Sequence, residues 1–117
     1  MAISRQTEEQ VLDRLSLFID AVRDRRGDLV KTMIAPEFTA VLPGHPERYA
    51  SPAEFVDTLP TPFVIDRVEV RAEGTIAWVF ARMVVGNLEG KEGWFSAVLR
   101  GTGHAWLIAQ VHGSLSA

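Results

Sequence analysis

The stretch Trp106-Leu107-Ile108-Ala109-Gln110-Val111-His112-Gly113-Ser114 decides the fold class that we expect of this chain. Successive residues of a β-strand point to opposite faces, so strict alternation predicts one face made of Trp106, Ile108, Gln110, His112 and Ser114. The other face is aliphatic. A face that combines an indole and an isoleucine with an amide, an imidazole and a hydroxyl is typical of the wall of a semi-polar cavity. The segment therefore predicts a strand that lines a pocket.

Three more strand-like runs precede this one, and short turns that contain glycine separate them. The four runs are residues 63–72, 75–85, 93–100 and 104–114. Connections this short predict an antiparallel meander, and strands this long predict a curved sheet. The run 76–81 is apolar on both faces. Helices can cover one face, and a second copy of the chain is the simplest cover for the other, so we expect a homodimer through the sheet face.

The first third of the chain is predicted to be helical. A capping box at residues 7–10 starts a helix whose apolar stripe is Val11, Leu15, Phe18 and Val22, and Gly27 is expected to cap its C-terminus. Asp28 is expected to cap a second, short helix that Pro36 helps to end. A second capping box at residues 51–54 predicts a third helix, which runs to about residue 59. Residues 38–42 are expected to form a short strand, and residues 43–46 a loop.

Composition excludes several classes of protein. The chain has 117 residues, enough for a single domain over residues 1–117, and its net charge of −3 argues against nucleic acid as a partner. It has no cysteine, and its three histidines lack a metal-binding spacing, so we expect neither a metal site nor a cofactor. No apolar run approaches the ~20 residues of a membrane span, and residues 1–10 lack the apolar core of a signal peptide, so we expect a cytoplasmic protein without a membrane partner.

The order of these elements resembles the nuclear transport factor 2-like superfamily, whose fold is a cystatin-like α+β cone. The C-terminal half also resembles the SnoaL-like group of that superfamily, in residues 74–79, 95–100 and 106–114. The resemblance implies an α+β fold in which three N-terminal helices pack on a long, curved, antiparallel β-sheet. It implies little about function, because the group includes isomerases, cyclases, dehydratases and assembly domains.

Two positions depart from patterns of these relatives. Trp94 stands where relatives often carry a basic residue, two positions before the Ser or Thr of the third meander strand. Ketosteroid isomerases of the superfamily place an aspartate base just before a proline, and the matching residue here, before Pro43, is Leu42. Leucine cannot abstract a proton, so we expect no isomerase activity of the aspartate-base kind.

Six residues are the candidates for ligand binding. His112 can act as an acid, a base or a hydrogen-bond donor to a ligand, or it can serve a structural role by bonding its neighbours. Gln110 can bind a ligand carbonyl or cross-link strands. Trp94, like Trp106, can stack on a flat ligand, and core packing is the alternative for Trp106. Arg82 is either an anion anchor in the pocket or an interface residue paired with a carboxylate. The set is completed by Phe18, from the first helix, and Tyr49, from the loop before the third helix.

Asp66 interrupts the apolar alternation of the strand predicted at residues 63–72. It either faces the covered side of the sheet or is turned outward by a β-bulge.

Three functions are compatible with this pattern. The first is a small-molecule-binding domain with a mixed-polarity cavity between sheet and helices, non-catalytic or accessory, whose ligand is a small apolar or mixed-polarity organic molecule. The second is an enzyme of the isomerase, cyclase or dehydratase type with His112 as its acid–base residue. The third is a homo-oligomeric interaction module whose pocket is vestigial.

Overall fold

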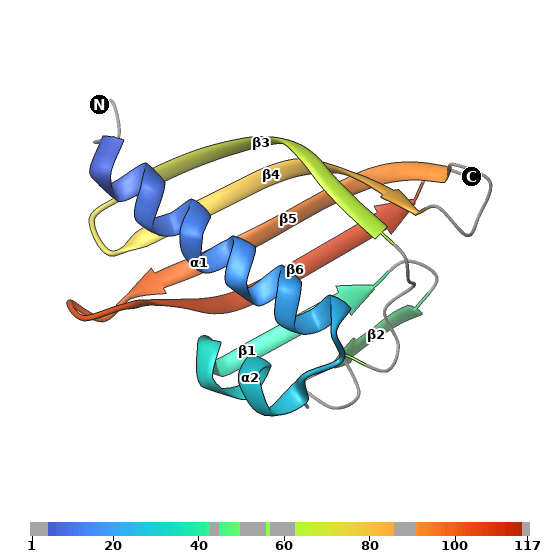
Figure 1. Cartoon of the computed structure of the whole chain (residues 1–117), viewed down its shortest axis with the longest axis horizontal. Helices are drawn as coiled ribbons and strands as arrows, with labels where there is room; N and C mark the ends of the chain where they lie inside the picture. Colours follow the sequence, from blue (N-terminus) through green and yellow to red (C-terminus); the bar gives the residue numbers. More distant parts are fainter. Residues whose placement is uncertain (1–4, 43–44, 50–55, 57–62, 86–90, 116–117) are drawn as a thin grey trace.

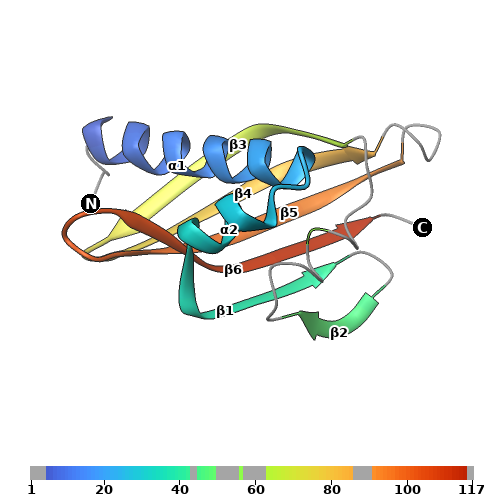
Figure 2. The same cartoon turned by 60° about the horizontal axis from the view of Figure 1, so that its bottom comes forward.

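A computed structural model describes residues 5–42, 45–49, 56, 63–85 and 91–115. Two helices and six strands occur in these ranges: α1 (Arg5–Arg23), α2 (Gly27–Met33), β1 (Ile34–Leu42), β2 (His45–Tyr49), β3 (Phe63–Glu73), β4 (Ile76–Val85), β5 (Lys91–Gly101) and β6 (Trp106–Leu115). The strands form one sheet in the order β2-β1-β6-β5-β4-β3, and both helices lie on the same face of it (Figures 1 and 2). The expected α+β architecture is confirmed at this level.

Helix α1 packs on the sheet through the apolar stripe read from the sequence. Val11, Leu15, Phe18 and Val22 are all buried in the core. Arg5 is already helical, so Thr7 lies within the helix and does not mark its beginning. Its C-terminus also differs from expectation, because Arg25, with φ of 54°, takes the left-handed position. Residues 25 and 26 donate backbone hydrogen bonds to the carbonyls of residues 22 and 21, which is a Schellman motif, and Gly27 instead begins α2.

The expected meander of four antiparallel strands is confirmed in β3 to β6. The sheet nevertheless has two further members. Strand β1 is longer than the predicted strand at residues 38–42, and it pairs with β6 in parallel. Strand β2 pairs antiparallel with β1 and includes His45, which the sequence placed in a loop. The third predicted helix, residues 51 to about 59, lies outside the described residues except for Val56, which is helical and buried.

A β-bulge in β6 overturns the alternation predicted for that strand. Leu99 pairs with Ile108, but its neighbour Val98 pairs with Gln110, so Ala109 is the extra residue. Trp106 and Ile108 therefore pack toward the helices, whereas Gln110 and later even-numbered residues point to the opposite, outer face. A turn at residues 101–103 that paired Arg100 with His104 would set Trp106 opposite Val98, and the two strands do not adopt that register. Trp106 pairs with Gly101 instead.

The layer between helices and sheet is an apolar core. Within the described part of the chain, no polar or charged side chain is buried. Large side chains from both layers fill this space, including Phe18 and Val22 of α1, Met83 of β4 and Leu99 of β5. The described helices include none that is both long and apolar enough to cross a membrane.

Candidate functional site

Helix α1 carries a second stripe beside its core stripe. Gln10, Asp13, Arg14 and Leu17 follow one another at intervals of three and four residues, so they share one face of the helix. Three of them are polar, and Leu17 is 56% exposed. Because the apolar stripe next to them is fixed against the sheet, these four side chains are held over the sheet at the N-terminal half of α1.

The tips of two hairpins lie opposite this stripe. In the β5–β6 turn, Thr102 accepts hydrogen bonds through Oγ1 from the backbone N–H groups of His104 and Ala105, at 3.3 and 3.2 Å. Gly103, with φ of 91°, supplies the left-handed conformation that this turn needs. The backbone N–H of Gly101 donates to the carbonyl of Thr75 at 2.7 Å, which ties this tip to the β3–β4 turn. The two tips therefore form one rigid platform.

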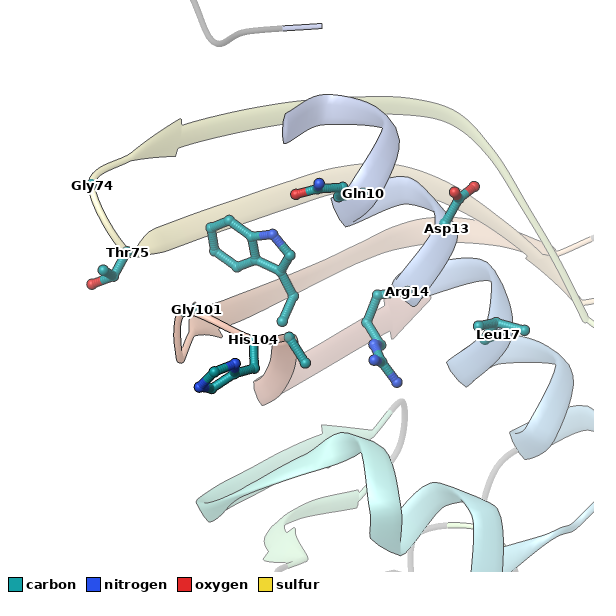
Figure 3. Close-up of a pocket in the computed structure, with 11 residues that line it drawn as sticks. Gln10, Asp13, Arg14, Leu17, Gly74, Thr75, Gly101 and His104 are labelled. Carbon is teal, nitrogen blue, oxygen red and sulfur yellow. The ribbon is translucent and has the colours of Figure 1, made fainter. Parts of the chain in front are cut away.

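The helix stripe and the platform border an open pocket of about 550 Å³ (Figure 3). Its lining comes from three segments of the chain: Gln10, Asp13, Arg14 and Leu17 of α1; Gly74 and Thr75 of the β3–β4 turn; and Gly101, Gly103, His104, Ala105 and Trp106 of the β5–β6 hairpin. The volume lies within the usual range for small-molecule sites, about 300–1,000 Å³. The lining combines a cation, a carboxylate, an amide, a hydroxyl and an imidazole with apolar surface.

Trp106 forms the aromatic wall of the pocket. It lies across from Gly101, and a Cβ added to that glycine would stand 3.4 Å from Cζ3 of the indole. The glycine therefore allows the ring to lie against the hairpin backbone, as aromatic residues commonly do beside strand glycines. Trp106 is half-buried, packs against the core and also lines the pocket.

Five of the six residues predicted to bind a ligand lie away from this pocket, and the side chain of the sixth, Tyr49, is not described. Trp94, Gln110 and His112 are exposed on the outer face of the sheet, and Arg82 is on the same face. Phe18 is enclosed in the core. Tyr49 ends β2, and its side chain is outside the described set. None of the six is among the described residues that line the pocket. The expectation that one cavity wall unites Trp106 with His112 fails because of the bulge at residue 109.

Arg82 has the carboxylate partners that one of its two interpretations required. Its guanidinium donates to Asp66 at 2.6 and 2.8 Å and to Glu92 at 3.3 Å. The Arg82 hydrogen bonds hold the pKa of the Asp66 carboxyl below its ordinary value, and they raise the pKa of Arg82. Asp66 reaches Arg82 because β3 has a bulge directly after it, with Arg67 at φ of 53°. Of the two interpretations of Asp66, the β-bulge that turns it outward is confirmed.

The pocket could have been sought from the sequence through the spacing of residues 10, 13, 14 and 17. A polar stripe next to a core stripe is common on surface helices, so this signal alone does not identify a site. The hairpin half of the pocket has no local sequence signal beyond its glycines. Among the described residues, no group of three or more histidines, aspartates or glutamates is arranged to hold a metal ion.

Comparison with known proteins identifies the family. The sequence profile described as the SnoaL-like domain matches residues 11–117. The chain belongs to the SnoaL-like domain family. This match covers α1 from the first residue of its core stripe through β6, and it confirms the resemblance read from residues 74–79, 95–100 and 106–114. Curated proteins include no match to this SnoaL-like chain.

Solved structures share the fold of this SnoaL-like domain at low sequence identity. A cystatin-like fold protein from Burkholderia xenovorans has a TM-score of 0.80 at 15% identity, over 97% of this chain and 95% of the other. A putative dehydratase of the NTF2-like family from Streptomyces avermitilis has a TM-score of 0.77 at 19% identity, over 97% and 99%. A putative Ca/calmodulin-dependent kinase II association domain from Exiguobacterium sibiricum has a TM-score of 0.72 at 11% identity, over 100% of this chain and 98% of the other. At such identities the similarity establishes the fold alone.

Proposed function

We propose that this SnoaL-like domain binds a small organic molecule of mixed polarity in the pocket at the hairpin tips, in a non-catalytic or accessory role. One observation carries the proposal. Within the described residues, the pocket is where charged, amide, hydroxyl and aromatic side chains meet around a space of about 550 Å³. A concave site with apolar walls and a few polar groups that fix orientation is the usual form of a small-molecule site.

The arrangement of titratable groups supports binding over catalysis. An acid–base catalyst must stand within hydrogen-bond reach of the substrate proton, usually in a site that excludes water. The described core contains no buried polar side chain, and Asp13 and His104 at the pocket are exposed. His112, the acid–base residue of the alternative enzyme hypothesis, is exposed on the outer face of the sheet. A substrate in the pocket would lie on the other side of the sheet from it.

The outer face favours a second property, assembly of two copies through their sheets. Trp78, Phe80 and Trp94 gather there and are 43%, 47% and 54% exposed, respectively. Ion pairs flank this aromatic cluster, with Arg82 toward one end of the strands and the Arg100–Glu37 pair, at 2.9 Å, toward the other. An apolar centre with a charged rim is the usual anatomy of a homodimer interface. In a two-fold symmetric dimer the same patch of both subunits forms the interface, so the charged rim of one copy can face that of the other. We therefore propose a homodimer through this face.

The three tryptophans provide a direct test of the binding site. Their indole N–H groups give separate NMR signals, and Trp106 reports on the pocket, whereas Trp78 and Trp94 report on the outer face. We expect a screen of aromatic and alicyclic fragments to yield compounds that shift the Trp106 signal and leave the other two unchanged. Trp106→Phe identifies the signal. A screen whose binders move only Trp78 and Trp94, or which finds no binder at all, would contradict the proposal.

A further inference from the structure

Arg14 is a pocket cation without an anionic partner among the described residues. It belongs to the polar stripe of α1, is half-buried, and lines the pocket. No ion pair or hydrogen bond of its guanidinium occurs within the part of the chain that the structure describes. The side chain of neighbouring Asp13 points away from it in Figure 3, so adjacency along the chain does not pair the two charges. A guanidinium carries five N–H donors in a planar fork, and no described residue accepts a hydrogen bond from those of Arg14.

Most other described arginines have hydrogen-bond or ion-pair partners. Arg5, Arg26, Arg82 and Arg100 each pair with a carboxylate, and Arg23 pairs with Asp20 and donates to a backbone carbonyl. Arg67 also has no ion pair among the described residues, but it is exposed at the β3 bulge and does not line the pocket. Among the described arginines, Arg14 alone combines partial burial, a place in a cavity and a free guanidinium. A partly desolvated cation in that position is suited to an anion that arrives with the ligand.

The rest of the lining indicates what the anion is attached to. Trp106 offers an indole ring, Leu17 an isobutyl group, and Gly103 a backbone that no side chain covers. These surfaces suit a flat apolar body, for which stacking on an aromatic face is favourable. We infer that the pocket recognises planar apolar carboxylates, with the carboxylate held by the fork of Arg14 and the ring system lying against Trp106. This inference rests on the proposed binding function of the same pocket.

Asp13 provides an opposing charge that can be used as an internal check. Its exposed carboxylate lines the same pocket as Arg14. A bound carboxylate is attracted by Arg14 and repelled by Asp13. Because the two residues are adjacent in the chain, substitution of either one changes the electrostatic potential at the same bound anion. Neutralising Asp13 should therefore strengthen binding of an anion, whereas neutralising Arg14 should weaken it.

The test compares 1-naphthylacetate with its neutral isostere 1-naphthylacetamide by calorimetry and by the Trp106 indole signal. We expect the acid to bind at least about tenfold more tightly than the amide, the size of effect typical of one charge-assisted hydrogen-bonded pair. Arg14→Gln should remove the preference for the acid and leave binding of the amide unchanged. Asp13→Asn should increase the preference for the acid. Arg5→Gln is the matched control, because Arg5 lies on the same helix and pairs with Glu9 outside the pocket.

The outcomes separate this inference from the function on which it rests. Equal binding of acid and amide at Trp106, unaffected by Arg14→Gln, would overturn carboxylate recognition and leave the pocket as a binding site. Absence of binding by both probes, with no fragment from the wider screen moving the Trp106 signal, would overturn both. A preference for the acid that survives in Arg14→Gln would also refute the role assigned to Arg14.

Discussion

The rings of Phe80 and Trp94 stack on the outer face of the sheet, with their centroids 5.2 Å apart and their planes inclined by 21°. They lie on neighbouring strands, where Phe80 pairs with Ser96 and Trp94 with Arg82, so the stack crosses the ladder diagonally. Both rings remain about half exposed in a single chain. An aromatic stack left this open to water is a natural centre for contact with a second sheet.

The first prediction concerns assembly. Light scattering at micromolar concentration should give a mass near twice the 12.9 kDa of one chain. Trp94→Lys should give the single-chain mass, because it would place an unpaired charge at the centre of the interface. Leu29→Lys, on exposed α2, is the control and should keep the dimer mass. A wild-type protein that runs as one chain, or a Trp94→Lys variant that still pairs, would refute the sheet-face dimer.

The second prediction contrasts two residues of β6 that strict alternation places on one face. Ile108 is fully buried, so Ile108→Ala should lower the free energy of unfolding by about 2–5 kcal/mol. His112 is exposed, so His112→Ala should change it by no more than about 0.5 kcal/mol. Urea denaturation in the Trp94→Lys background would measure both without a contribution from assembly. Similar decreases in the free energy of unfolding for the two variants would mean that β6 has no bulge between Ile108 and His112.

The third prediction tests the bulge by deletion. Removing Ala109 should leave a folded protein, because Ile108 and Val111 then follow regular alternation and both still face the helices. Removing Val111 instead should prevent folding, since it would turn His112 into the apolar core. Near-ultraviolet circular dichroism distinguishes a packed core from its loss. If both deletions fold equally well, residue 109 is not the extra residue of the strand.

The fourth prediction is a pH dependence of stability. The hydrogen bonds from Arg82 lower the pKa of Asp66 below its ordinary value of 3.8. A lowered pKa in the folded state means that the pair stabilises the protein above pH 3.8 and that this contribution disappears as the pH falls through the lowered value. Asp66→Asn should therefore lower the denaturation midpoint slightly at pH 7, and the difference from wild type should shrink toward about pH 2.

The control for this effect is Asp13→Asn, whose carboxylate has no ion pair in the described part of the chain. The difference in denaturation midpoint between Asp13→Asn and wild type should not shrink at low pH in the same way. A constant deficit of Asp66→Asn across this pH range would show that the aspartate matters for reasons other than its charge.

Local chemistry in the sequence was enough to predict much of the fold. The apolar stripe of α1 and the meander of β3 to β6 follow from spacing and from turn residues, because both depend on contacts between near neighbours. The bulge after Asp66 was also visible, since a carboxylate broke an apolar alternation. The parallel pairing of β1 with β6 was not, because it joins segments separated by more than half the chain and has no local signature.

The site depended on tertiary structure for a different reason. Ala109 is small and aliphatic, so as an extra residue it breaks no visible pattern, and either alternation of β6 is acceptable until one face packs on α1. That packing buries Ile108 and sends His112 outward. The spacing of Gln10, Asp13 and Arg14 was present in the sequence from the start. Only the three-dimensional fold brings two hairpin tips beneath that stripe, because a pocket is made by surfaces that chain order does not place together.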